Sequence, residues 1–152
     1  MSVVILYGSE TGTAEVVSDS ISDVLTENHD VSMYDMSEFA VEDLSAEDFY
    51  VVVCSTYGEG ELPTGAEPFA EALDNEKPAL DGLRFAMFGL GDSVYDDTYN
   101  RGGEIMAEKL TELGATQVGE HGRHDASSKV SAKVQAAEWA QQISPLISPA
   151  LR

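Results

Sequence analysis

Residues 3–17 of the chain read VVILYGSETGTAEVV, an apolar run followed by a short loop and an amphipathic segment. The apolar run 3–7 ends at Gly8, which predicts a buried strand. From Ala14 onward, apolar residues recur at helical spacing with acidic residues between them, which predicts a helix. The loop between them is rich in small and hydroxyl-bearing residues. A strand, such a loop and a helix in this order form a suitable cradle for a phosphate.

This loop would have to hold an anion without any cationic side chain. The first Lys or Arg of the chain is Lys77, and the preceding 76 residues contain 18 carboxylates. Ser9, Thr11 and Thr13 offer hydroxyl donors, Gly12 allows backbone N–H groups to converge, and the helix contributes the positive end of its dipole. Each charge-assisted hydrogen bond to a phosphate is worth about 1.5–3 kcal/mol. The alternative is an ordinary capped turn between strand and helix.

Two other phosphate-binding motifs are absent from the sequence. A P-loop requires Gly-Lys-Ser/Thr, but Gly12 is followed by Thr13 and Ala14. A dinucleotide fingerprint requires its glycines after the first strand. The pair Gly89 and Gly91 instead follows the fourth expected strand and lacks a third glycine.

Strands alternate with helices along the rest of the chain. The stretch FYVVVC (residues 49–54) is almost entirely apolar, as expected of a parallel strand covered on both faces. The alternation predicts a doubly wound α/β fold, with one domain over residues 1–152. The other expected strands cover 31–36, 83–88 and 116–118; a short helical turn covers 45–48, and further helices begin at a capping box at 64–67 and cover 105–113 and 130–147.

Two further loops follow expected strands and are longer than an α/β connection needs. They cover residues 55–64 and 90–100, whereas such connections usually take about 2–6 residues. Tyr57 lies in the first of these loops, and Tyr95 and Tyr99 lie in the second. These rings either stack on a flat ligand or pack the loops against the protein. Beside a phosphate loop, they favour a flat phosphorylated heterocycle as the ligand.

The charge and composition of the chain limit its partners and its location. A formal net charge of −20 over 152 residues argues against binding nucleic acid. The charge either steers the protein toward a basic partner or reflects adaptation to high salt, and composition leaves both possibilities open. The single cysteine, Cys54, cannot form an internal disulfide, and no stretch is apolar enough to span a membrane, so we expect a cytoplasmic protein.

Three stretches of the chain together resemble the flavodoxin family, especially the FMN-binding domains of diflavin reductases, and the small proteins of the MioC type are also similar. They are SETGTAE (9–15), STYGEG (55–60) and LGD (90–92) leading to Tyr95 and Asn100. The resemblance implies the strand order 2-1-3-4-5, helices on both faces of the sheet, and non-covalent FMN. The implied cofactor-binding residues are Ser9, Glu10, Thr11, Gly12, Thr13, Ala14, Ser55, Thr56, Tyr57, Gly58, Gly60, Leu90, Gly91, Asp92, Tyr95, Tyr99 and Asn100.

The resemblance implies an electron carrier rather than an enzyme. Such a protein moves single electrons between a basic-surfaced flavin reductase and an acceptor protein, and we expect it to be a monomer. The alternative is an FMN-dependent reductase that acts on a small substrate such as a quinone. A phosphorylation receiver domain is discarded, because Gly8 and Cys54 occupy positions where it needs acidic residues. Met1 and the complete final helix favour a free-standing protein over a fragment of a diflavin enzyme.

Overall fold

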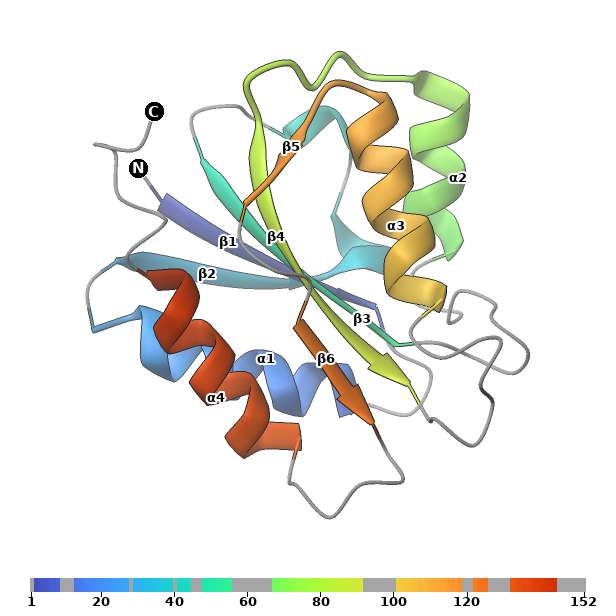
Figure 1. Ribbon diagram of the computed structural model, residues 1–152. Helices are drawn as coiled ribbons and strands as arrows, with labels where there is room; N and C mark the ends of the chain where they lie inside the picture. The colour runs from blue at the N-terminus through green and yellow to red at the C-terminus, as the bar shows by residue number, and fades with distance from the viewer. Residues whose placement is uncertain are drawn as a thin grey trace.

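The computed structural model describes residues 2–8, 13–27, 29–39, 41–44, 48–55, 67–91, 101–118, 122–125 and 132–144. Strands and helices alternate along these ranges (Figure 1). The strands are β1 (Ser2–Gly8), β2 (Asp30–Asp35), β3 (Phe49–Ser55), β4 (Arg84–Gly91), β5 (Thr116–Gln117) and β6 (Gly122–Asp125). The helices are α1 (Thr13–Leu25), α2 (Glu67–Glu76), α3 (Arg101–Glu112) and α4 (Ala132–Ile143), with 3₁₀ turns η1 (Met36–Glu38) and η2 (Val41–Asp43).

The strands form one parallel sheet in the order β2-β1-β3-β4-β5, which confirms the expected doubly wound fold. The chain leaves β1 for β2 on one side and returns to β3 on the other. The direction of winding therefore reverses between β1 and β3. In open α/β sheets a ligand binds at such a switch point, beyond the carboxyl ends of the strands.

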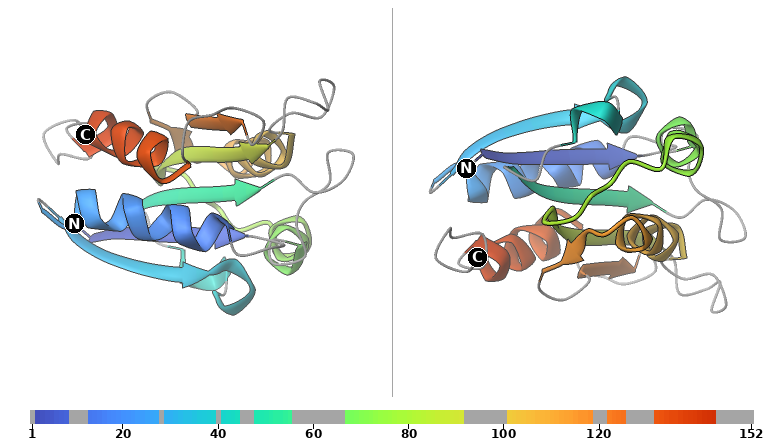
Figure 2. Two further views of the ribbon diagram at one scale, coloured as in Figure 1. Left: turned by 90° about the horizontal axis from the view of Figure 1, so that it is seen from below. Right: turned by 90° about the horizontal axis from the view of Figure 1, so that it is seen from above.

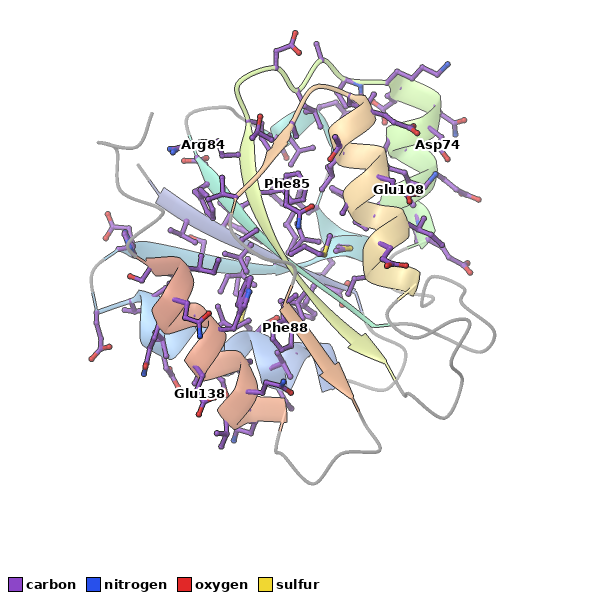
Figure 3. All side chains as sticks on the ribbon, viewed as in Figure 1. Asp74, Arg84, Phe85, Phe88, Glu108 and Glu138 are labelled. Atoms are coloured by element: carbon purple, nitrogen blue, oxygen red, sulfur yellow. The ribbon has the colours of Figure 1, made fainter. Side chains whose placement is uncertain are left out.

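Helices cover both faces of the sheet, as the apolar strands predicted. Helices α2 and α3 lie on one face, and α1 and α4 lie on the other (Figures 1 and 2). Side chains alternate between the two cores: Phe85 of β4 belongs to the core under α2 and α3, whereas Phe88 belongs to the core under α1 and α4 (Figure 3). Trp139 of α4 packs edge-on against Phe88 with ring centroids 5.3 Å apart and belongs to the buried core.

The fifth position in the sheet is filled by two short strands rather than one. β5 pairs with the start of β4 at Arg84 and Phe85, and β6 pairs with its end from Phe88 to Gly91. Both pair with the edge of β4 that β3 leaves open, so they follow one another along that edge. The expected strand 116–118 corresponds to β5 alone, and β6 was not expected from the sequence.

Other expected boundaries differ from the structure by a few residues. Met36 was expected to end the second strand, but it begins η1 and is buried in the core. Helix α4 ends at Ile143 and Ser144 forms a 3₁₀ turn, because Pro145 cannot supply a backbone N–H to a continuing helix. The remaining ends of the expected helix 130–147, most of the expected turn 45–48 and the capping-box residues 64–66 lie outside the described residues.

Positively charged residues are distributed unevenly along the chain. The segment that forms β1, α1, β2, β3 and α2 contains no Lys or Arg. Positive side chains begin at Lys77, and the β4 half of the molecule carries Arg84 and Lys109. Lys109 of α3 forms an ion pair with Asp74 of α2, with 2.7 Å between Nζ and Oδ2. None of the helices in the described ranges combines the length and apolarity that crossing a bilayer requires.

The packing of α1 leaves one polar atom unsatisfied. Ser18 is fully buried, and its Oγ has no hydrogen-bond partner among the described residues. A buried hydroxyl without a partner costs about 1–3 kcal/mol. Ser18 therefore lowers the stability of the fold.

Replacing Ser18 with alanine should stabilise the protein. Ser18→Ala should raise the free energy of unfolding, measured by urea denaturation, by about 1–2 kcal/mol, because it removes the unsatisfied hydroxyl and favours the helix. Ser20→Ala in the same helix is the matched control, because Ser20 is only half-buried and its replacement gains mainly helix propensity, about 0.5 kcal/mol. Equal effects of the two substitutions would contradict the assignment of Ser18 as a destabilising buried group.

Candidate functional site

Three strand ends and one helix start meet at the carboxyl edge of the sheet. Parallel pairing aligns Gly8 of β1 with Cys54 of β3, and Cys54 with Gly89 of β4. Ser55 pairs in turn with Leu90. Because neighbouring strands lie about 4.8 Å apart, the ends of β1 and β4 are about 10 Å from each other. The last described residues of β1, β3 and β4 therefore lie side by side at one edge of the sheet.

Helix α1 begins at this edge with its N-terminus next to the end of β1. Its first turn contains Thr13 and Ala14, followed by Glu15, and the 13-residue helix carries no Lys or Arg. The first N–H groups of a helix have no intrahelical partner, and the helix dipole makes its N-terminus electropositive. This helix start can therefore hold an anion without a basic side chain.

Tyr7 and Glu15 lie on either side of the connection from β1 to α1, and sequence reasoning did not single them out. The Tyr7 hydroxyl donates a hydrogen bond to Oε2 of Glu15, with 3.4 Å between the oxygens. Partial burial raises the pKa of Tyr7, and the nearby carboxylates of Glu15, Asp35 and Glu38 raise it further. Tyr7 therefore remains a protonated donor through the neutral pH range. A tyrosine eight residues before a helical glutamate gives no recognisable sequence signal.

Strand β6 also lies at this edge, beside the last residues of β4. His124 pairs with Leu90, and Asp125 pairs with Gly91. The backbone of His124 therefore belongs to the sheet. The segment GRHD has no apolar pattern that would identify it as a strand. β6 joins the sheet by backbone pairing to the edge of β4 that β3 leaves open.

The structure places five of the predicted site residues and leaves the others outside the described ranges. Thr13 and Ala14 are in the first turn of α1, Ser55 ends β3, and Leu90 and Gly91 end β4. All five therefore belong to elements that meet at the carboxyl edge. The predicted site residues outside the described ranges are Ser9, Glu10, Thr11, Gly12, Thr56, Tyr57, Gly58, Gly60, Asp92, Tyr95, Tyr99 and Asn100.

The donors that can be placed suit a phosphorylated ligand better than a metal ion. Within β1, β3 and β4, the aligned row below the edge contains Gly8, Cys54 and Gly89, all buried and small, so these three strands place no bulky side chain in this row. The helix start offers neutral N–H donors, which suit a phosphate. In the same described ranges, no three His, Cys, Asp or Glu side chains cluster so as to hold a metal ion.

Cys54 lies one residue before the end of β3, close to this edge. It is fully buried in the core under α2 and α3, and burial raises the pKa of its thiol to about 12. At neutral pH the thiol is protonated and has little nucleophilic character. The burial of Cys54 agrees with the apolar stretch 49–54 that predicted a strand covered on both faces.

The strand order and the start of α1 at the switch point define a doubly wound α/β protein whose candidate site lies at the carboxyl edge of the sheet. Comparison with known proteins identifies its family. The sequence profile of the flavodoxin family matches residues 5–139. The chain belongs to the flavodoxin family. FMN is the cofactor of this family and therefore of this chain, and the uncharged donors at the start of α1 fit its phosphate.

Individual relatives cover this chain almost completely. The uncharacterized protein PA3435 of Pseudomonas aeruginosa is 38% identical over 146 residues, which cover 91% of this chain and 93% of that protein. The structure of a cysteine-to-serine mutant of flavodoxin from Pseudomonas aeruginosa superposes with a TM-score of 0.86 and 35% identity, covering 97% of this chain and 99% of that one. The flavoprotein alpha-component of NADPH sulfite reductase from Klebsiella pneumoniae is 35% identical, but the match covers 93% of this chain and only 23% of that protein.

The buried thiol of Cys54 should make stability depend on pH in the alkaline range. The pKa of the thiol is about 12 in the folded protein and 9.0 as the ordinary value, so above pH 9 the unfolded chain loses a proton that the folded protein keeps. Ionisation therefore stabilises the unfolded state, and folding stability falls as pH rises, with a slope that approaches about 1.4 kcal/mol per pH unit.

Guanidinium unfolding at pH 8, 9 and 10 would measure this slope. Cys54→Ala is the reference, because it keeps every other titrating group. The difference in unfolding free energy between wild type and Cys54→Ala should shrink as pH rises. Parallel pH profiles for the two proteins would show that the thiol is not insulated from solvent.

Proposed function

We propose that this protein carries single electrons between a flavin reductase and an acceptor protein, with FMN bound at the carboxyl edge of the sheet. The observation that supports this most directly is the start of α1, an uncharged anion site at the β1/β3 switch point. Bound FMN supplies the one-electron redox chemistry, and the chain supplies binding and orientation. The alternative, an FMN-dependent reductase of small substrates such as quinones, is not favoured by family membership.

The predicted site residues divide into two groups by role. Those of the first loop and of α1 hold the phosphate through hydroxyl and backbone donors, whereas the two later loops enclose the ring. Tyr57 and Tyr95 cover its two faces, and backbone groups of Thr56, Gly58, Gly91 and Asp92 contact its edge. The phosphate group consists of Ser9, Glu10, Thr11, Gly12, Thr13 and Ala14, and the ring group further includes Ser55, Gly60, Leu90, Tyr99 and Asn100.

Acidic residues of the enclosing loops adjust the electrostatics of the site. Glu59, Glu61 and Asp92 belong to these loops by sequence. A carboxylate about 8 Å from the ring opposes added negative charge there by roughly 2 kcal/mol at an effective dielectric constant of about 20. Since about 1.4 kcal/mol corresponds to about 59 mV for one electron, a few such carboxylates favour a strongly reducing carrier.

The net charge of the protein supports basic-surfaced redox partners, because opposite charges accelerate association. We propose a monomeric, cytoplasmic carrier whose single domain covers residues 1–152. The chain spans nearly all of PA3435 but about a quarter of the Klebsiella sulfite reductase component. The similarity to that component supports a reductase as the electron donor.

Purified protein reconstituted with FMN should bind one equivalent of the cofactor and show its visible absorption bands. Titration of apoprotein by isothermal calorimetry and absorption spectroscopy would measure stoichiometry and affinity. Because the proposed site combines a phosphate cradle with a ring pocket, FMN should bind more tightly than riboflavin. An apoprotein that takes up neither compound would refute the proposed function. Steady-state quinone reduction with NAD(P)H and no added reductase would instead favour the enzyme alternative.

Electron transfer to or from a basic partner should slow as ionic strength rises. Salt screens attraction between exposed charges, with a Debye length of about 10 Å at 0.1 M and about 3 Å at 1 M. Stopped-flow mixing with a basic flavin reductase at 0.05–1 M KCl would give the dependence, and a neutral osmolyte is the control for viscosity. A rate that is flat or rises with salt would favour salt adaptation as the reason for the charge.

A further inference from the structure

Glu15 occupies a position from which it competes with a phosphate. Helix α1 begins at Thr13, so Glu15 is the third helical residue. A glutamate at this position commonly bends back to accept a hydrogen bond from the N–H of the residue before the helix, as in a capping box. That N–H belongs to the set of unpaired donors that a helix start offers to an anion. A carboxylate that caps the helix in this way would occupy the phosphate's donors and repel its charge.

In the structure the carboxylate of Glu15 has another donor. Its Oε2 accepts the hydrogen bond from the Tyr7 hydroxyl, at 3.4 Å. Tyr7 belongs to β1, and its half-buried ring packs against the core under α1 and α4, so the hydroxyl is presented from a fixed element. Glu15 itself is exposed and has no such anchor. The tyrosine therefore selects where the glutamate lies.

We propose that Tyr7 is a positioning residue of the cofactor site, which keeps the Glu15 carboxylate away from the N-terminal N–H groups of α1 and leaves them to the phosphate of FMN. This inference rests on the proposed function, because it assumes that the phosphate binds at the start of α1. Tyr7 itself needs no contact with the cofactor. Its effect should depend on the phosphate and on Glu15.

A double-mutant cycle tests whether the effect of Tyr7 depends on the phosphate and on Glu15. Its readout is the Kd from calorimetric titration of the apoprotein. The variants are Tyr7→Phe, Glu15→Ala and the double variant, and each is titrated with FMN and with riboflavin, which lacks the phosphate. Tyr34→Phe is the matched control, because Tyr34 is an exposed tyrosine on β2. Thermal melting of each apoprotein verifies that the variants are folded.

Tyr7→Phe should raise the Kd of FMN about threefold to tenfold, the effect of one exposed hydrogen bond, and leave the Kd of riboflavin unchanged. Glu15→Ala should bind FMN at least as tightly as wild type. In the Glu15→Ala background, Tyr7→Phe should have less than about a twofold effect, because the competing carboxylate is gone. Tyr34→Phe should change neither affinity.

Three results would overturn the inference while leaving the proposed function intact. They are an unchanged Kd of FMN in Tyr7→Phe, an equal loss of riboflavin and FMN affinity, or the same Tyr7→Phe effect with and without Glu15. Failure of the proposed function has a different signature, since wild-type apoprotein would then bind neither FMN nor riboflavin.

Discussion

Burial of β1, β3 and β4 on both faces is the constraint on which the rest of the structure depends. Most of their side chains alternate between two apolar cores, so the strands offer few polar groups along their length. Polar loops follow where the strands end, and parallel pairing brings all three ends to one edge. The register of the sheet, rather than any single side chain, therefore determines where a cofactor can bind. The same register places the start of α1 beside that edge.

A net charge of −20 does not prevent such a site from holding an anion, because distance and screening limit most of the repulsion. At physiological ionic strength the Debye length is about 8 Å, so carboxylates farther away have little effect. Hydrogen bonds to the phosphate act at contact distance, and each contributes about 1.5–3 kcal/mol. The carboxylates that matter are those within a turn of the helix start. Glu15 is one of these, which is why its bond to Tyr7 bears on affinity.

Sequence alone was sufficient for the parts of the fold that depend on apolar patterning. β1 and β3 were recognisable as apolar runs, and their apolar residues are buried in the structure. β6 was not recognisable, because it has no apolar residue and joins the sheet through backbone pairing to the edge of β4 that β3 leaves open. The candidate site likewise has parts that the sequence predicts and parts that it does not. The meeting of the three strand ends at one edge follows from the strand order and is seen in the structure. The contact between Tyr7 and Glu15 depends on how α1 packs against β1, and no periodicity in the sequence encodes that packing. Most of the predicted ring-binding residues lie outside the described ranges, and the roles of all of them stay predictions.

The segment that forms β1, α1, β2, β3 and α2 has no Lys or Arg, and this affects how the protein approaches other charged molecules. The contrast in sequence charge between these strands and β4 runs across the sheet, whereas the proposed cofactor site lies at the strand ends. A positively charged surface attracts the acidic segment before β4 more strongly than the rest of the chain. That attraction alone does not orient the carboxyl edge, so contacts made at the edge itself have to supply the orientation.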